Sequence, residues 1–136
     1  FKKVNDTYGH IAGDRCLMVF AQLLQDKSRT SDYLFRLGGE EFLILSTNKH
    51  IMDATNYADK LRLTVERSPV HFEDQLIHMT VSGGVSFAKQ GASPENILNS
   101  MLSRADIALY KAKNAGRNRI CISNDREEKG ANQATQ

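Results

Sequence analysis

The order of apolar and polar positions predicts three helices and several strands. Apolar residues recur at helical spacing in three segments: residues 14–27, 51–67 and 94–115. Residues 33–46 contain two apolar runs around a pair of glycines, which predicts a β-hairpin. Residues 76–87, with a centre weakened by two glycines, and residues 118–122 are predicted to be strands.

The ends of these elements carry recognisable signals. Residues 1–13 are polar and turn-rich, so they are predicted to form a loop. Ser93 is the expected N-cap of the third helix, Pro94 its first helical residue, and Gly116 the residue that ends it. The run Phe42–Leu45 is continuously apolar and is therefore expected to be buried on both faces.

Helices interleaved with strands predict an α/β (α+β) fold, with a mixed central sheet flanked by helices. One domain is expected over residues 1–123, and a disordered tail over residues 124–136, which are polar and lack periodicity. Because the chain starts with Phe1 and a helix precedes the first strand, we expect a further strand before residue 1 and a longer parent protein.

Composition excludes several classes of function. The 136 residues carry 18 basic and 16 acidic side chains, a net charge of +2, so neither a nucleic-acid partner nor membrane contact by this segment is expected. Cys16 and Cys121 are isolated, which excludes a Cys-x-x-Cys motif and favours a reducing cytoplasm. No apolar run approaches the roughly 20 residues of a membrane span.

The most informative stretch is the hairpin tip, residues 38–42. Gly38 and Gly39 permit the positive φ of a tight turn and leave room for a ligand beside the backbone. They precede two adjacent acids, Glu40 and Glu41, and oxygen ligands of this kind suit a divalent cation. The alternative is a pair of solvated acids on an exposed turn.

Five segments, in order, resemble the GGDEF-type diguanylate cyclase family. They are Phe1–His10, Gly13-Asp14, Gly38–Phe42, Thr80–Val85, and Ala105–Lys113 with Gly116–Asn118. The resemblance implies a nucleotide-cyclase or palm-like fold that condenses two GTP molecules into cyclic di-GMP and pyrophosphate. It also implies a head-to-tail homodimer and a reaction that depends on Mg²⁺ or Mn²⁺. At Gly83 the family usually has a larger apolar residue.

The resemblance assigns roles at the hairpin tip and the first loop. It implies that Glu40 binds the metal and accepts a proton, that Glu41 supports the metal, and that Lys2 stabilises the transition state. Gly38 and Gly39 then contact substrate.

The resemblance also implies nucleotide contacts elsewhere. Asn5 and Asp14 correspond to guanine-binding residues, His10 to a substrate contact, and Lys113 and Arg117 to residues that contact the triphosphate. From chemistry alone, these positions equally suit a turn Asn, a helix-start Asp, a loop His and two cations that favour a helix dipole.

Arg29 and Asp32 form an Arg-x-x-Asp motif just before the hairpin. It resembles the family's inhibitory product site, in which arginine binds cyclic di-GMP in a bidentate manner. Lys60 or Arg62 from the next helix could complete that site. The alternative is an ordinary polar loop.

The chain departs from the family at its start, where a strand ending in Asp-x-Asp is expected before Phe1. Without that strand, we expect this chain to be inactive as a cyclase and its sheet to have an unpaired central gap. In the full-length protein we expect an N-terminal sensor domain, with any membrane anchor upstream. Two alternatives to the enzyme are a non-catalytic GGDEF-like module that senses GTP or cyclic di-GMP, and an interaction domain without a ligand.

Overall fold

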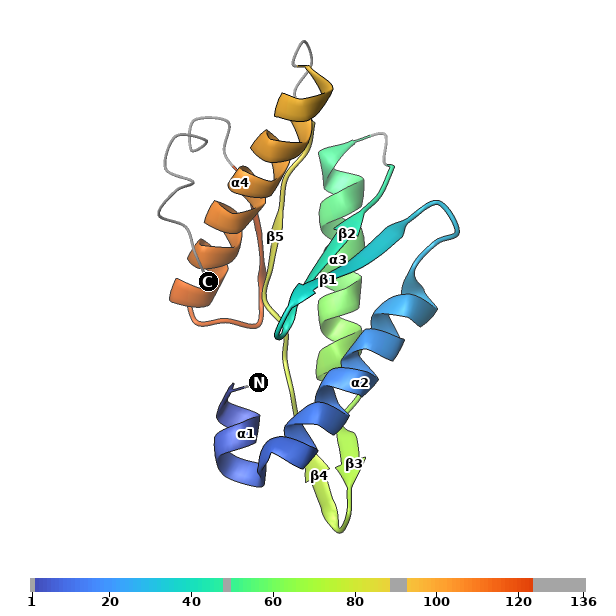
Figure 1. Ribbon diagram of the computed structural model, residues 1–136, viewed down its shortest axis with the longest axis vertical. Coiled ribbons are helices and arrows are strands. Elements are labelled where there is room, and N and C mark those ends of the chain that lie inside the picture. The colour runs from blue at the N-terminus through green and yellow to red at the C-terminus, as the bar shows by residue number, and fades with distance from the viewer. Residues whose placement is uncertain (1, 48–49, 89–92, 124–136) are drawn as a thin grey trace. The chain divides into compact units, whose positions relative to one another are not determined.

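The computed structural model describes residues 2–47, 50–88 and 93–123 (Figure 1). The chain divides into two compact units, here called the first unit (Phe1–Asn48 with Leu63–Thr80) and the second unit (Lys49–Arg62 with Val81–Gln136). The division crosses helix α3 (Ile51–Glu66), which matches the predicted second helix closely. The predicted disordered tail, residues 124–136, lies outside the described residues.

The first unit opens with two helices, α1 (Lys2–Tyr8) and α2 (His10–Lys27). They meet at Gly9, whose φ of 95° breaks the helix (Figure 1). The prediction of a loop over residues 1–13 is therefore wrong, and α2 begins before the expected Asp14. Val4 and Ala12 are buried where α1 packs on α2, so tertiary packing overrides the local turn signals.

The predicted hairpin is confirmed as strands β1 (Tyr33–Gly38) and β2 (Glu41–Leu45), paired antiparallel. The register is interrupted by a bulge between Arg36 and Gly38, close to the turn. The prediction that Phe42–Leu45 is buried on both faces is wrong, because these residues are only half-buried. In the described residues β2 has a single paired neighbour, β1.

Helix α2 organises the core of the first unit. Cys16, Phe20 and Leu24 are buried at a spacing of four residues, as an apolar helical stripe requires. The ring of Phe20 meets the ring of Phe42 edge to face, with centroids 5.1 Å apart. Such a pair adds about 0.5–1.5 kcal/mol beyond its buried area, so it holds the start of β2 on α2.

The first unit also contains a short second hairpin, β3 (Val70–Phe72) and β4 (Gln75–Ile77), with β3 in contact with α2. The prediction of one strand over residues 76–87 is wrong. The first residues of this segment belong to β4. In the rest of the segment only Gly83–Val85 forms a strand, β5. The turn of this hairpin uses Glu73 at a φ of 55°, which a non-glycine residue rarely adopts, so the turn carried no strong sequence signal.

The second unit is built from β5, helix α4 (Pro94–Asn114) and β6 (Ile120–Ile122). The two strands pair in parallel and α4, which connects them, packs on β5 (Figure 1). Helix α4 begins where Ser93 and Pro94 predicted, although the Ser93 side chain makes no capping hydrogen bond.

The end of α4 follows the prediction at Gly116, whose φ is 120°. The amide of Gly116 donates to the Lys113 carbonyl and the amide of Arg117 donates to the Ala112 carbonyl. This is the Schellman arrangement, in which a residue with positive φ satisfies the last carbonyls of a helix.

A buried arginine lies inside the second unit. Arg104 has no exposed surface, and its guanidinium lies 5.2 Å from the centroid of the Phe87 ring. Its Nε donates to Ser100 at 3.1 Å and its Nη2 donates to the Phe87 carbonyl. The arginine therefore ties α4 to the chain that follows β5.

The α/β class is confirmed by this mixture of helices with parallel and antiparallel strands. The described residues form three two-stranded sheets: β1–β2, β3–β4 and β5–β6. No helix in the described part of the chain combines the length and apolarity that a bilayer crossing demands.

Candidate functional site

The hairpin tip of the first unit has the conformation that its glycines predicted. Gly38 has a φ of 138° and Gly39 a φ of 50°, both in the region that favours glycine. A β-carbon on either glycine would meet no atom within 4 Å. The backbone of the tip is therefore open on that side, as a ligand-binding turn needs.

Arg36 holds the tip from inside the hairpin. Its guanidinium donates from Nε at 3.0 Å and from Nη2 at 2.6 Å to the carbonyl oxygen of Gly39. Two donors from a rigid, planar group fix one carbonyl in both distance and direction. Arg36 was not predicted from the sequence, although its position three residues before the second turn glycine could have indicated it.

The two acids at the tip differ in exposure. Glu40 lies in the turn and is exposed, whereas Glu41 opens β2 and is half-buried. Across residues 2–47, 50–88 and 93–123, no three acidic, histidine or cysteine side chains gather closely enough to hold a metal ion. The pair still suits Mg²⁺, which commonly uses one or two carboxylates together with substrate phosphates and water.

The packing of α1 on α2 brings the Asn5 side chain to Gly13, the neighbour of Asp14 in the sequence. The Asn5 amide lies against Gly13, the residue that precedes Asp14, at a place where a β-carbon on Gly13 would be only 2.7 Å from Asn5 Cγ. Asn5 is half-buried and Asp14 is exposed. The Asn5 amide therefore rests on the α2 backbone one residue before Asp14, and both side chains carry groups that can pair with a polar base edge.

The same helix connects this pair to the hairpin. Phe20 contacts Phe42, which directly follows the two tip acids. About 9 Å of α2 separates Asp14 from Phe20, at 1.5 Å per residue. One helix therefore anchors both groups of candidate residues within the first unit.

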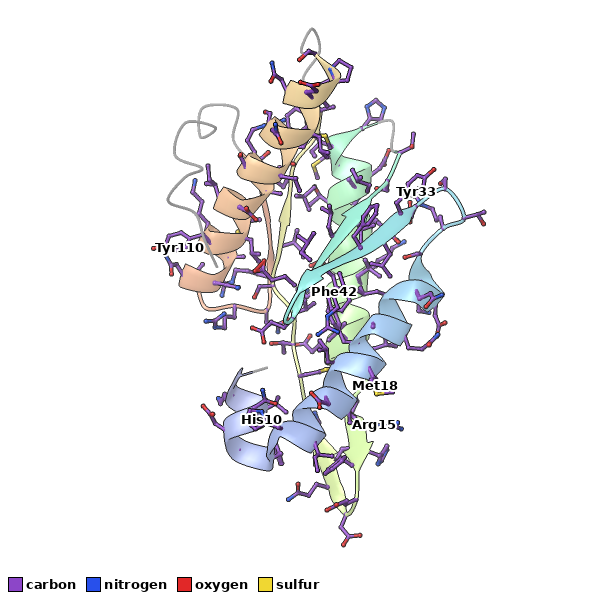
Figure 2. All side chains as sticks on the ribbon, in the orientation of Figure 1. His10, Arg15, Met18, Tyr33, Phe42 and Tyr110 are labelled. Carbon is purple, nitrogen blue, oxygen red and sulfur yellow. The ribbon has the colours of Figure 1, made fainter. Side chains whose placement is uncertain are left out.

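Two further candidates lie at the start of the chain. His10, labelled in Figure 2, is the first residue of α2 and is exposed. Lys2 is the first residue of α1, and its side chain lies outside the described part of the structure.

Lys113 and Arg117 belong to the second unit, at the C-terminal end of α4. Lys113 is half-buried in the last turn of the helix, and Arg117 is exposed just beyond it with a φ of 65°. Burial raises the pKa of Asp106 on the same helix, and the positive charge of Lys113 partly opposes that rise. The positive charge of Lys113 therefore interacts with the Asp106 carboxylate.

Arg29 and Asp32 close a tight turn between α2 and β1. The Arg29 amide donates to Asp32 Oδ2 at 2.9 Å, and the Asp32 amide donates to the Arg29 carbonyl at 2.9 Å. The Arg29 guanidinium donates to Asp32 Oδ1 at 3.3 Å and to the Thr47 carbonyl at 3.4 Å. The aspartate thus orients the arginine from within the loop.

The exposure of this pair is uneven. The Asp32 side chain has no exposed surface, whereas 45% of the Arg29 side chain is accessible. A concavity of about 440 Å³ lies beside them, lined by Gln25, Ser28, Arg29, Thr30, Asp32 and Leu34. Its volume falls in the range of small-molecule sites, so the guanidinium has space in which to meet a ligand.

Lys60 and Arg62, suggested as a completion of that site, lie on α3 in the second unit. Arg62 Nε donates to Asp59 at 2.7 Å, and its Nη1 donates to Asn118 Oδ1 at 3.0 Å. The backbone N–H of Asn118 donates to the Ser82 hydroxyl at 3.1 Å. Arg62 therefore joins α3 to the turn after α4.

Comparison with known proteins identifies a family that the chain matches. The family profile described as "Diguanylate cyclase, GGDEF domain" matches residues 1–119. Diguanylate cyclase A of Treponema denticola is 38% identical over 126 residues, which cover 90% of this chain and 32% of that protein. The chain thus spans about a third of the length of this relative.

The chain also resembles solved structures of this family. The active GGEEF domain of a diguanylate cyclase from Vibrio cholerae superposes with a TM-score of 0.79 at 35% identity, over 91% of this chain and 76% of that one. The GGDEF domain of DgcB from Caulobacter crescentus, solved in complex with c-di-GMP, gives a TM-score of 0.79 at 28% identity. That match covers 89% of this chain and 70% of the other.

Proposed function

The chain belongs to the GGDEF family of diguanylate cyclase domains, and we propose that it serves the synthesis of cyclic di-GMP from two molecules of GTP. The main support for the proposal is the structure of the hairpin tip. Two glycines with positive φ, a carbonyl clamped by Arg36 and two adjacent carboxylates form an open, acidic turn. Such a turn suits a metal-bound triphosphate better than it suits a core or an ordinary loop.

In this proposal the 3′-hydroxyl of one nucleotide attacks the α-phosphate of the other. A bond forms between that oxygen and phosphorus, the bond to the β-phosphate oxygen breaks, and pyrophosphate leaves. Repeating the step with the nucleotides exchanged closes the ring. Glu40 accepts the proton of the attacking hydroxyl, since it is the exposed carboxylate at the tip.

Mg²⁺ or Mn²⁺ is the proposed cofactor, held by Glu40 with support from Glu41. When bound, the ion neutralises charge on the transferring phosphate and lowers the pKa of the attacking hydroxyl. The role of the protein is chiefly to position the nucleotide, because phosphoryl transfer depends on alignment and charge more than on covalent chemistry.

Asn5 and Asp14 are proposed to recognise guanine. The Asp14 carboxylate can accept both N–H groups of the guanine N1 and N2 edge, and the Asn5 amide can pair with a further edge atom. His10 is a proposed additional contact. Lys113 and Arg117 would bind the triphosphate, and Lys2 would stabilise the transition state, since cations favour developing phosphate charge.

Arg29 and Asp32 are proposed as a product-binding site that inhibits the enzyme. Asp32 already fixes one guanidinium nitrogen of Arg29, and the accessible part of the arginine borders the concavity described above. An oriented guanidinium can bind a guanine edge or a phosphate in a bidentate manner. The related DgcB domain was solved with c-di-GMP, which supports this assignment.

The remaining partners follow from the chemistry. Two nucleotides must face each other, so we propose a head-to-tail homodimer, and a sensor domain in the full-length protein. We also propose a strand that precedes residue 1, since each strand within the described residues pairs on one edge only. Free cysteines at Cys16 and Cys121 agree with a cytoplasmic location.

The competing function is a non-catalytic module that senses GTP or cyclic di-GMP. Calorimetric titration of the chain with each nucleotide separates the enzyme from a sensor of cyclic di-GMP alone. The enzyme proposal predicts binding of both GTP and cyclic di-GMP, whereas a product sensor binds only cyclic di-GMP. Binding of neither would refute both.

A second experiment addresses catalysis. Incubation with GTP and Mg²⁺ should give no cyclic di-GMP from this chain alone, but product from the chain extended by its preceding residues. Product formation by this chain alone would refute the need for a preceding strand. Failure of the extended chain to form product, despite binding GTP, would favour the sensor.

A further inference from the structure

Gly13 lies in α2 at the place where the Asn5 side chain rests. A β-carbon on Gly13 would overlap with Oδ1 of Asn5 and would lie 2.7 Å from its Cγ and 3.5 Å from its Nδ2. Every residue other than glycine carries that carbon. The amide of Asn5 therefore occupies a space that only glycine leaves open.

Backbone geometry does not explain this glycine. Gly13 lies inside a helix and is absent from the glycines with positive φ, which are Gly9, Gly38, Gly39 and Gly116. Glycine inside a helix is less stable than alanine, because it loses more conformational freedom on folding. Gly13 therefore makes helix α2 less stable than alanine would. Its benefit is the space that it leaves for the Asn5 side chain.

We infer that Gly13 is a positioning residue for base recognition, which acts by seating the Asn5 amide against the α2 backbone, one residue before Asp14. This inference rests on the proposed function. The packing of the amide against the α2 backbone restricts its rotation, so less side-chain entropy is lost when a base binds. An alanine at position 13 displaces the amide and leaves Asp14 to recognise the base without it.

The steric part of the inference can be tested without any nucleotide. Thermal unfolding is compared for the wild type, Gly13→Ala, Asn5→Ala and the double variant. Gly13→Ala should lower Tm in the wild-type background, because the new carbon overlaps with the amide. In the Asn5→Ala background the same substitution should raise Tm, because the overlap is gone and the better helix former remains.

A change of Tm with the same sign and size in both backgrounds would overturn the inference. The double variant keeps the test informative even if Gly13→Ala alone does not fold. If Gly13→Ala alone does not fold, the double variant should fold at least as well as Asn5→Ala. Failure of the double variant to fold would show that alanine at position 13 is excluded for another reason.

The functional part uses calorimetry with GTP and with ATP in Mg²⁺ buffer. Gly13→Ala should weaken GTP binding roughly tenfold, as much as Asn5→Ala does, since each removes the same hydrogen bond. The preference for GTP over ATP should fall equally in both. The double variant should bind GTP no more weakly than Asn5→Ala, because the glycine acts only through the amide.

The outcomes separate the inference from the proposed function. If the wild type does not bind GTP, the proposed function fails, and the nucleotide role of Gly13 fails with it. If the wild type binds GTP and Asn5→Ala weakens binding, an unchanged affinity in Gly13→Ala overturns the inference alone.

Discussion

Gly84 in β5 is the position where we expect one added methyl group to damage the second unit most. A β-carbon there would overlap with the Ala105 carbonyl oxygen, and would lie 2.5 Å from the Leu109 nitrogen and 3.1 Å from the Ala108 carbonyl carbon. All three are backbone atoms of α4, which cannot rotate away. Gly84→Ala must therefore push β5 and α4 apart.

The magnitude follows from two opposing effects. Overpacking a well-packed site costs about 1–3 kcal/mol, and a rigid helix backbone places this case near the upper end. Alanine also restricts the unfolded chain, which returns about 0.4–1 kcal/mol. The net loss in the free energy of unfolding should be about 2 kcal/mol, or a fall in Tm of roughly 5–10 °C.

Gly83, its neighbour, provides the matched control. A β-carbon at Gly83 would meet only the terminal Cδ1 of Ile120, at 2.8 Å, and that methyl group can rotate. Gly83→Ala should therefore change the free energy of unfolding by less than about 1 kcal/mol. Adding Ile120→Val removes Cδ1, so the double variant should be at least as stable as Gly83→Ala.

The assay is chemical denaturation followed by circular dichroism for the wild type and each variant. If Gly84→Ala is as stable as Gly83→Ala, the close approach of β5 to α4 is wrong.

The other predictions concern charge. Arg36→Ala removes both donors to the Gly39 carbonyl; because the pair is exposed, stability should fall by less than about 1 kcal/mol, while GTP affinity falls roughly tenfold and Arg36→Lys recovers part of it. Unchanged GTP affinity in Arg36→Ala would show that the two hydrogen bonds to the Gly39 carbonyl do not support GTP binding. Burial raises the pKa of Asp106 above 3.8, so its stabilising contribution is complete below that pH and is lost as the pH rises through the raised pKa. Asp106→Asn should therefore gain stability relative to wild type over that pH range, and a constant difference would contradict this. Lys113→Met should raise the pKa of Asp106 further in an NMR titration; an unchanged pKa would show that Lys113 does not act on it.

Features with strong local signals could be predicted from the sequence. The glycine pair required positive φ, and both the hairpin and its turn were found where expected. Pro94 and Gly116 marked the ends of α4 because each has a backbone preference that few other positions satisfy. The structure places Glu40 in the predicted turn and Glu41 at the start of β2, and their role as metal ligands remains a prediction.

Features that depend on tertiary packing could not be predicted. Helix α1 forms because Val4 is buried against α2, whereas its own sequence favours turns. The hairpin of β3 and β4 turns at Glu73, which has no strong turn preference. The contact of Asn5 with Gly13 joins two helices, so helical periodicity within either one could not show it.

The central claim is that the acids of the hairpin tip gather a divalent cation around bound GTP. The most direct test is calorimetric titration of GTP, with and without Mg²⁺, into the wild type and Glu40→Gln. We predict that Mg²⁺ tightens GTP binding to the wild type and that most of this gain is lost in Glu40→Gln. An equal gain from Mg²⁺ in both proteins would contradict the account, because the cation would then act away from the tip.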